Sequence, residues 1–195
     1  LDRWQPRHAV VYNDNVTWPS TFIIAPGMLF DQYGDSQPIE RHYDAMKRWI
    51  EHMTGYLEND LMPRDNYGDW CVPPESKELI HSKDPSRKTA KTLLGTSYFY
   101  YDLLLMAKYA RMLGKPGDAA EFTALAKRLE TAFNKEFFKP DQNIYDNGTQ
   151  TSSVLTLAFD LVPEGHRAGV FGSLVQNITT KTDNHIGTGL VGGQW

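Results

Sequence analysis

The sequence predicts an all-α protein built from helical hairpins, and two observations support this. Three times along the chain, a segment that is apolar nearly all round is followed by a segment with a single apolar face. No segment requires a β-strand. A helix that is covered on both sides is apolar all round, whereas a surface helix keeps one polar face. We therefore expect two concentric rings of helices, of which three hairpins form half; an ordinary all-α bundle is the alternative.

The first hairpin is expected over residues 18–57. Residues 18–34 are apolar nearly all round, and Pro26 with Gly27 marks a point where a kink is expected. Ser36 and Pro38 are typical of a helix start. The apolar residues that follow recur at spacings of three and four, which indicates one buried helical face. They are Ile39, Tyr43, Met46, Trp49, Ile50, Met53 and Leu57.

The second hairpin is expected over residues 92–137. Its first helix, residues 92–113, has little polar face and should be buried, and Gly114 is expected to end it. Asp118 is followed three residues later by Glu121, a pattern that resembles a capping box and predicts the start of the next helix. The apolar face of that helix comprises Phe122, Leu125, Leu129, Phe133 and Phe137.

The third hairpin follows a polar loop over residues 140–149. Residues 150–161 are its apolar member, and Pro163 with Glu164 is expected to open the amphipathic one. A glycine-rich segment, residues 186–193, comes next. It does not resemble a phosphate-binding loop, because no strand precedes it and the Lys-Ser/Thr ending is missing.

Size and composition narrow the possible functions. The 195 residues are enough for one domain with a substantial core, and residues 1–17 are expected to be an irregular lead-in. The net charge of −4, with interspersed signs, argues against a nucleic-acid surface. No apolar run approaches the roughly 20 residues of a membrane span. The single cysteine, Cys71, excludes internal disulfides, and the six histidines show no metal-binding spacing.

The long segment over residues 59–90 is expected to be a functional loop. It carries Gly68, Asp69 and Trp70 between Pro63 and the pair Pro73–Pro74. Sugars are commonly held by a carboxylate that accepts hydroxyl hydrogens and an aromatic ring that covers the C–H face. The triplet therefore suggests a sugar-binding loop, whereas the alternative is that Trp70 plugs the core and Asp69 caps a local turn.

Several short motifs occur in an order that resembles the bacterial α-L-rhamnosidases of glycoside hydrolase family 78. The resemblance covers nearly the whole chain beyond residue 15. Each motif is weak alone, and the ordered set is fairly specific. The motifs are Trp18-Pro19-Ser20, Gln32-Tyr33-Gly34-Asp35, Gly68-Asp69-Trp70, Gly148-Thr149-Gln150-Thr151, residues 159–164 (FDLVPE) and His185-Ile186-Gly187-Thr188-Gly189.

The resemblance implies an (α/α)6 barrel of six hairpins that hydrolyses terminal α-L-rhamnose with inversion and needs no metal or other cofactor. Trp18 and Trp70 match aromatic residues that line the rhamnose pocket, and Asp69 either touches the sugar or holds the loop. The family's general acid lies upstream of the first tryptophan, and its general base lies downstream of the Gly-Thr-Gly loop. Neither motif occurs here, so the chain is expected to be the middle of a larger catalytic domain. Asp69 is the only weak catalytic candidate.

Two further residues are candidates for sugar contacts. His185 lies in the glycine-rich loop and could donate to a sugar hydroxyl, and Gln150 begins an apolar helix and could face the cavity, although a helix-start role fits it equally. Pro19-Ser20 departs from the Gly-Asp that many family members have after this tryptophan. A potential sugar-binding acid is therefore missing there.

The favoured function is thus a piece of an inverting α-L-rhamnosidase that is inactive alone and acts on rhamnose-containing carbohydrate. Another (α/α)6 glycosidase and a non-catalytic helical module that binds sugar or protein are the alternatives. Half a barrel should expose its apolar inner helices around residues 22–29 and 154–161, so we expect the chain to associate with itself or with the rest of its parent. A periplasmic or exported location is suggested only by the family's part in plant polysaccharide breakdown.

Overall fold

The computed structural model describes residues 14–73, 78, 84 and 87–195, and its architecture is all-α, as predicted. Most of the proposed lead-in, residues 1–13, lies outside the described residues. The helices occur in three successive pairs. They are α2 (Thr21–Tyr33), α3 (Gln37–Thr54), α4 (Lys91–Met112), α5 (Pro116–Phe137), α6 (Gln150–Ala158) and α7 (Arg167–Gln176), and α7 continues into the π-helical turn η3 (Asn177–Lys181).

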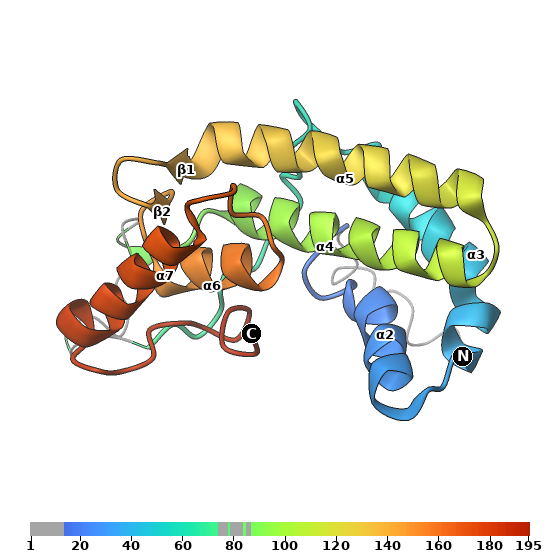
Figure 1. Cartoon of the computed structure of the whole chain (residues 1–195). Coiled ribbons are helices and arrows are strands. Elements are labelled where there is room, and N and C mark those ends of the chain that lie inside the picture. The colour runs from blue at the N-terminus through green and yellow to red at the C-terminus, as the bar shows by residue number, and fades with distance from the viewer. Residues whose placement is uncertain (1–13, 74–77, 79–83, 85–86) are drawn as a thin grey trace, which may run out of the picture.

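The middle pair organises the molecule. Helices α4 and α5 lie alongside each other, with α2 and α3 near one end and α6 and α7 near the other (Figure 1). Helix α4 also packs against α2, α3 and α6. The apolar member of the second hairpin is therefore covered on several sides, which is what its lack of a polar face predicts.

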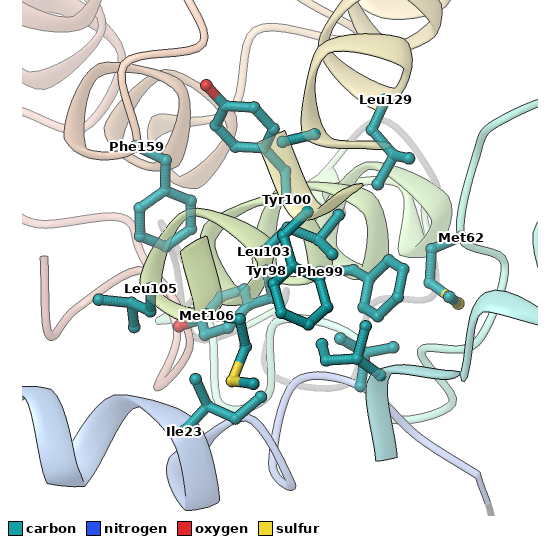
Figure 2. Packing of buried hydrophobic residues seen from close by; sticks show 14 of the residues in the cluster. Ile23, Met62, Tyr98, Phe99, Tyr100, Leu103, Leu105, Met106, Leu129 and Phe159 are labelled. Atoms are coloured by element: carbon teal, nitrogen blue, oxygen red, sulfur yellow. The ribbon is translucent and has the colours of Figure 1, made fainter. Parts of the chain in front are cut away.

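The core is built around α4. In Figure 2 its side chains point outward around the helix, toward Ile23 of α2, Leu129 of α5, Met62 of the loop after α3 and Phe159 at the end of α6. All four of these partner residues are almost without solvent exposure. Because one helix buries residues on nearly every side, the three hairpins share a single core.

The first hairpin follows the prediction closely. The predicted face of α3 is buried at Ile39, Tyr43, Met46, Ile50 and Met53. Helix α2 continues through Pro26 without ending there. One turn of the helix near this proline contacts α4, because the Tyr109 hydroxyl donates to the carbonyl of Ile23 at 2.8 Å. A Cβ at Gly27 would collide with that hydroxyl, so the glycine allows α2 to approach α4 closely.

The start of α5 differs from the prediction. The helix begins at Pro116, with Lys115 at the N-cap position, and Asp118 lies inside the first turn without capping it. The Asp118 carboxylate instead accepts from the Tyr43 hydroxyl and the Lys47 ammonium, each at 2.8 Å. The capping-box prediction was therefore wrong, because this side chain ties α5 to α3 rather than to its own backbone.

Three features around the third hairpin also differ from the prediction. A short antiparallel ladder, β1 (Phe138–Lys139) with β2 (Ile144–Tyr145), precedes it where only a polar loop was expected. Helix α6 ends at Ala158, three residues early, because Asp160 adopts a left-handed φ of 59°. Helix α7 starts at Arg167, after a turn over residues 163–166.

Large apolar side chains remain exposed on α2 and α7. Phe22, Met28 and Leu29 of α2 and Phe171 and Val175 of α7 are each more than a third exposed. Beside Phe171, an open pocket is lined by Val154 and Leu157 of α6 and by Trp195. The segments expected to expose apolar surface do so in part. Among the described residues, no helix combines the length and apolarity needed to cross a membrane.

Candidate functional site

The glycine-rich segment, residues 186–193, is the feature around which the candidate site is arranged. It runs beside α6 (Figure 1). Three side chains from distant parts of the sequence hold its backbone: Asp69 from the loop after α3, Gln150 from the start of α6, and Tyr98 from α4. An otherwise irregular segment thereby acquires a defined conformation.

Asp69 holds the middle of the segment. One carboxylate oxygen accepts from the backbone N–H of Gly189 at 2.8 Å and from the Thr151 hydroxyl. The other accepts from the N–H groups of Val191 at 3.0 Å and Gly192 at 3.3 Å. Hydrogen bonds from backbone N–H groups to an ionised carboxylate are about twice as strong as neutral ones. Asp69 therefore acts as a hub between the loop, α6 and the glycine-rich segment.

Gln150 holds the beginning of the segment. Its Oε1 accepts from the N–H of Gly187 at 2.7 Å. Its Nε2 donates to the Thr182 hydroxyl at 2.9 Å and lies 3.3 Å from the carbonyl of His185. Gln150 is 4% exposed, and its amide points into this network. The adjacent Thr149 provides the N-cap of α6, since its hydroxyl accepts from the N–H of Ser152.

Tyr98 holds the end of the segment. Its hydroxyl donates to the carbonyl of Val191 at 3.1 Å and accepts from Gln194 at 2.7 Å and from the Trp195 indole at 2.9 Å. Burial raises the pKa of Tyr98 to about 12. The hydroxyl is therefore protonated at neutral pH and available as the donor that Val191 needs.

The glycines fit against these anchors. A Cβ on Gly189 would collide with the Trp70 carbonyl and lie 2.6 Å from Asp69 Oδ1. A Cβ on Gly192 would lie 2.6 Å from the Thr151 hydroxyl, and one on Gly187 would lie 3.0 Å from Gln150 Nε2. Gly189 and Gly192 have no room for a side chain, because the Trp70 carbonyl and the Thr151 side chain occupy that space, and Gly187 is tightly packed against Gln150.

The Gly-Asp-Trp triplet lies at an anchored loop tip. Gly68 has a left-handed φ of 71°, and its N–H points to the buried Asp65 carboxylate at 3.4 Å. Asn15 accepts from the N–H of Asn66 at 2.9 Å, which fixes the other side of the turn. The backbone carbonyl of Trp70 accepts from Leu190 at 2.7 Å. The loop and the glycine-rich segment therefore hold each other in place.

The two tryptophans are both accessible, and they line neighbouring pockets. Trp70 is 59% exposed and lines a pocket of about 400 Å³ with Tyr67, Thr89 and Lys91. Trp18 is 44% exposed and lines a second pocket, of about 470 Å³, with Thr21, Gly189 and Leu190. Both volumes fall in the range of small-molecule sites.

The two pockets share a boundary. The ring of Tyr67, which lines the Trp70 pocket, meets the Trp18 ring edge-on with centroids 6.4 Å apart. Gly189 and Leu190 line the Trp18 pocket and also contact Trp70. The glycine-rich segment thus lines the Trp18 pocket and holds the backbone of Trp70, whose side chain lines the neighbouring pocket.

His185 lies at the edge of this arrangement. It is exposed, its Nδ1 lies 2.9 Å from the carbonyl of Thr182, and it lines a third pocket with Pro73, Asn184 and Ile186. An Nδ1–H that donates to a carbonyl leaves Nε2 free for a ligand. The structure therefore brings Asp69, Gln150 and both tryptophan loops to one segment, with His185 at its start.

Sequence reasoning did not single out a buried acid, Asp102 of α4. Its carboxyl group has no solvent exposure, and Ser20 Oγ lies 2.6 Å from its Oδ2. Burial raises its pKa well above the usual range for an aspartate. The signal in the sequence was one acid within the apolar run over residues 98–107. Among the residues that the structure describes, no group of three or more His, Cys, Asp or Glu side chains is arranged to hold a metal ion.

A family model described as the bacterial α-L-rhamnosidase six-hairpin glycosidase domain matches residues 2–195. This chain belongs to that family. An α-L-rhamnosidase of Formosa agariphila is 32% identical over 186 residues, which are 94% of this chain and 19% of that protein. An α-L-rhamnosidase of Streptomyces avermitilis is 31% identical and covers 90% of this chain and 15% of its own length.

Solved structures of α-L-rhamnosidases share the fold. The crystal structure of the Streptomyces avermitilis α-L-rhamnosidase complexed with L-rhamnose has a TM-score of 0.80 and 30% identity, and the match covers 92% of this chain and 16% of that one. The enzyme of Dictyoglumus thermophilum gives a TM-score of 0.81 at 31% identity, over 93% and 20% of the respective chains. The described helical pairs are therefore part of a six-hairpin glycosidase domain, and this chain spans about a fifth of the length of the relatives it matches.

Proposed function

We propose that this chain contributes part of a catalytic domain that hydrolyses terminal, non-reducing α-L-rhamnose residues of glycosides or polysaccharides. The observation that carries the proposal is the pair of exposed tryptophans, Trp18 and Trp70, which line two pockets that meet at the ring contact between Tyr67 and Trp18. Indoles cover apolar C–H surface and also carry an N–H donor. Rhamnose is a 6-deoxy sugar whose methyl group suits such walls.

In this proposal the chain supplies the walls of the sugar site. Trp18 and Trp70 each offer an aromatic wall in adjoining pockets, backbone groups near Gly189 line the Trp18 pocket, and His185, which lines a third pocket, offers Nε2 as a hydrogen-bond partner. Gln150 shapes the site by fixing the backbone at Gly187. The residues 1–195 then act as one unit within a larger domain.

The acid and base of the reaction come from outside this chain in our proposal. Inverting glycosidases use two carboxyl groups about 6.5–9.5 Å apart, one that protonates the leaving oxygen and one that activates water. Asp69 is poorly suited to either task, because backbone N–H groups and the Thr151 hydroxyl already bind both of its oxygens. The exposed apolar residues of α2 and α7 are proposed contacts with the rest of the parent protein.

Hydrolysis of 4-nitrophenyl α-L-rhamnoside tests the proposal directly. We expect turnover by the intact parent protein and almost none by residues 1–195 alone. Equal specific activity of the two would show that the acid and base lie within this chain. An inactive parent that hydrolyses another aryl glycoside instead would reject the proposed substrate.

A further inference from the structure

We propose that Asp69 and Gln150 are positioning residues for sugar binding: they fix the backbone of the glycine-rich segment, which forms one wall of the Trp18 pocket and holds the backbone of Trp70. The inference rests on the proposed function for its sugar, although the anchoring itself can be tested without one. In this inference Asp69 is not one of the catalytic carboxylates, and its role is to anchor the glycine-rich segment.

The hydrogen-bonding capacity of Asp69 is used up by the protein. An ionised carboxylate offers about four acceptor sites. Four donors occupy them: the N–H groups of Gly189, Val191 and Gly192, and the Thr151 hydroxyl. No acceptor site remains for a sugar hydroxyl, so the carboxylate influences a ligand only through the backbone that it holds.

Gln150 completes the anchoring from α6. Its amide is 4% exposed and bonds to Gly187 N–H and the Thr182 hydroxyl. Thr151, the next residue, donates to Asp69. The first turn of α6 thus bonds directly to residues 185–187 through Gln150. It is linked to residues 189–192 through the bond between Thr151 and Asp69. The helix therefore determines where the segment lies.

The anchored backbone connects to both pockets. Gly189, Leu190 and Val191 line the Trp18 pocket, and the N–H of Leu190 bonds to the Trp70 carbonyl at 2.7 Å. Loss of either anchor should therefore loosen one wall of the Trp18 pocket and the backbone of Trp70 together. A site that is about 1 Å too loose loses much of its binding or activity.

The variants separate anchoring from other effects. Asp69→Asn replaces one acceptor oxygen with an N–H₂ group that faces N–H donors. Thr151→Val removes the hydroxyl donor at constant size, and Thr151→Ser keeps it. Gln150→Glu keeps the acceptor for Gly187 and removes the donor to Thr182. Asp141→Asn, on the exposed turn after β1, is the matched control for the charge change.

Hydrogen–deuterium exchange of the peptide over residues 187–193 reports the anchoring. We expect exchange about tenfold faster or more in Asp69→Asn and Gln150→Glu, a smaller increase in Thr151→Val, and wild-type rates in Thr151→Ser and Asp141→Asn. Unchanged protection in Asp69→Asn and Gln150→Glu would overturn the proposal. Unfolding temperatures measured in parallel confirm that the variants are folded.

L-Rhamnose calorimetry and aryl rhamnoside kinetics on the intact parent report the consequence for the sugar. We expect Asp69→Asn to weaken L-rhamnose binding about tenfold or more, to raise KM, and to change kcat less. A kcat lost by several orders of magnitude at unchanged KM and unchanged exchange would make Asp69 a catalytic group instead. Faster exchange with unaltered rhamnose affinity would also overturn the inference. If wild-type protein binds no L-rhamnose, the proposed function fails, whereas the exchange data still test the anchoring.

Discussion

The hydroxyl oxygen of Ser20 lies 2.6 Å from Oδ2 of Asp102, and neither side chain has any solvent exposure. The same hydroxyl lies 2.9 Å from the carbonyl oxygen of Val16. Ser20 has one hydrogen for two acceptors, so both contacts are hydrogen bonds only if Asp102 is itself a donor. A neutral Asp102 donates to Ser20 while Ser20 donates to Val16, in agreement with the raised pKa that burial causes.

A neutral Asp102 makes stability depend on pH. Because its pKa is raised in the folded state, its contribution to stability is fully present below the unfolded pKa of about 3.9 and is lost as the pH rises toward the folded value, by about 1.4 kcal/mol per pH unit. Asp102→Asn mimics the neutral acid and removes this loss. We expect its unfolding temperature relative to wild type to rise as the pH increases within the range 4.5–7.5.

Thermal unfolding across that pH range, with Asp141→Asn as the exposed control, checks this prediction. The control should show no such trend, because Asp141 lies on an exposed turn. A constant difference between Asp102→Asn and wild type, or a variant that loses stability as the pH rises, would mean that Asp102 is ionised in the folded protein.

Tyr98→Phe should weaken the end of the glycine-rich segment. The substitution removes a buried hydroxyl that serves Val191, Gln194 and Trp195. Of these partners only Val191 is buried; leaving its carbonyl unsatisfied costs about 1–3 kcal/mol, and we expect a free energy of unfolding lower by about that amount. Urea titration measures it, and faster exchange of the Trp195 indole hydrogen should accompany it. Unchanged stability and exchange would show that these bonds contribute nothing in solution.

Trp70→Ala should reduce sugar affinity and Trp49→Ala should reduce stability. Trp70 is exposed and lines a pocket, so its loss should reduce L-rhamnose affinity about tenfold, or about 1.4 kcal/mol, with little change in stability. Trp49 is half-buried and meets Phe99 edge-on at 6.4 Å. Its loss should cost about 2 kcal/mol of stability and leave the affinity of the folded protein unaltered. Calorimetry with parallel denaturation measures both, and the reverse pattern would contradict the assignment.

The exposed apolar side chains of α2 and α7 should make the isolated chain associate. Leu29 and Phe171 are 39% and 58% exposed, and both lie among other exposed apolar residues. We expect light scattering to show species larger than a monomer at moderate concentration, and Leu29→Glu with Phe171→Glu to reduce them. The control substitution Asp141→Asn, at an exposed acidic position, should leave the association unchanged. A monodisperse wild-type monomer would contradict this prediction.

The local patterns predicted most of the helices, whereas the site depended on distant contacts. The face of α3 could be predicted because Ile39, Tyr43 and Met46 lie three or four residues apart on one helix. The bonds of Asp69 to Gly189 and Val191 join residues 120 and 122 positions apart, so no periodicity could indicate them. Asp118 was misplaced for the same reason, since its partners lie on α3.

The sequence motifs predicted which amino acids are candidates for sugar contacts. They did not predict how those residues are arranged in space. The ordered motifs singled out Trp18 and Trp70 as a pair, and the structure adds that the two residues line separate pockets, of which the glycine-rich segment lines the one at Trp18. Gln150 was expected either at a helix start or facing a cavity. It begins α6 and directs its amide into the backbone of residues 185–187.

The central claim, that Trp18 and Trp70 face a bound sugar, is tested most directly by following the indole N–H signals in a two-dimensional NMR titration with L-rhamnose. The chain has five tryptophans, and single substitutions assign each signal. We predict saturable shifts of the Trp18 and Trp70 signals at one common dissociation constant, while the Trp49 signal stays in place. Unmoved Trp18 and Trp70 signals at millimolar L-rhamnose, or equal shifts of all five, would contradict the account.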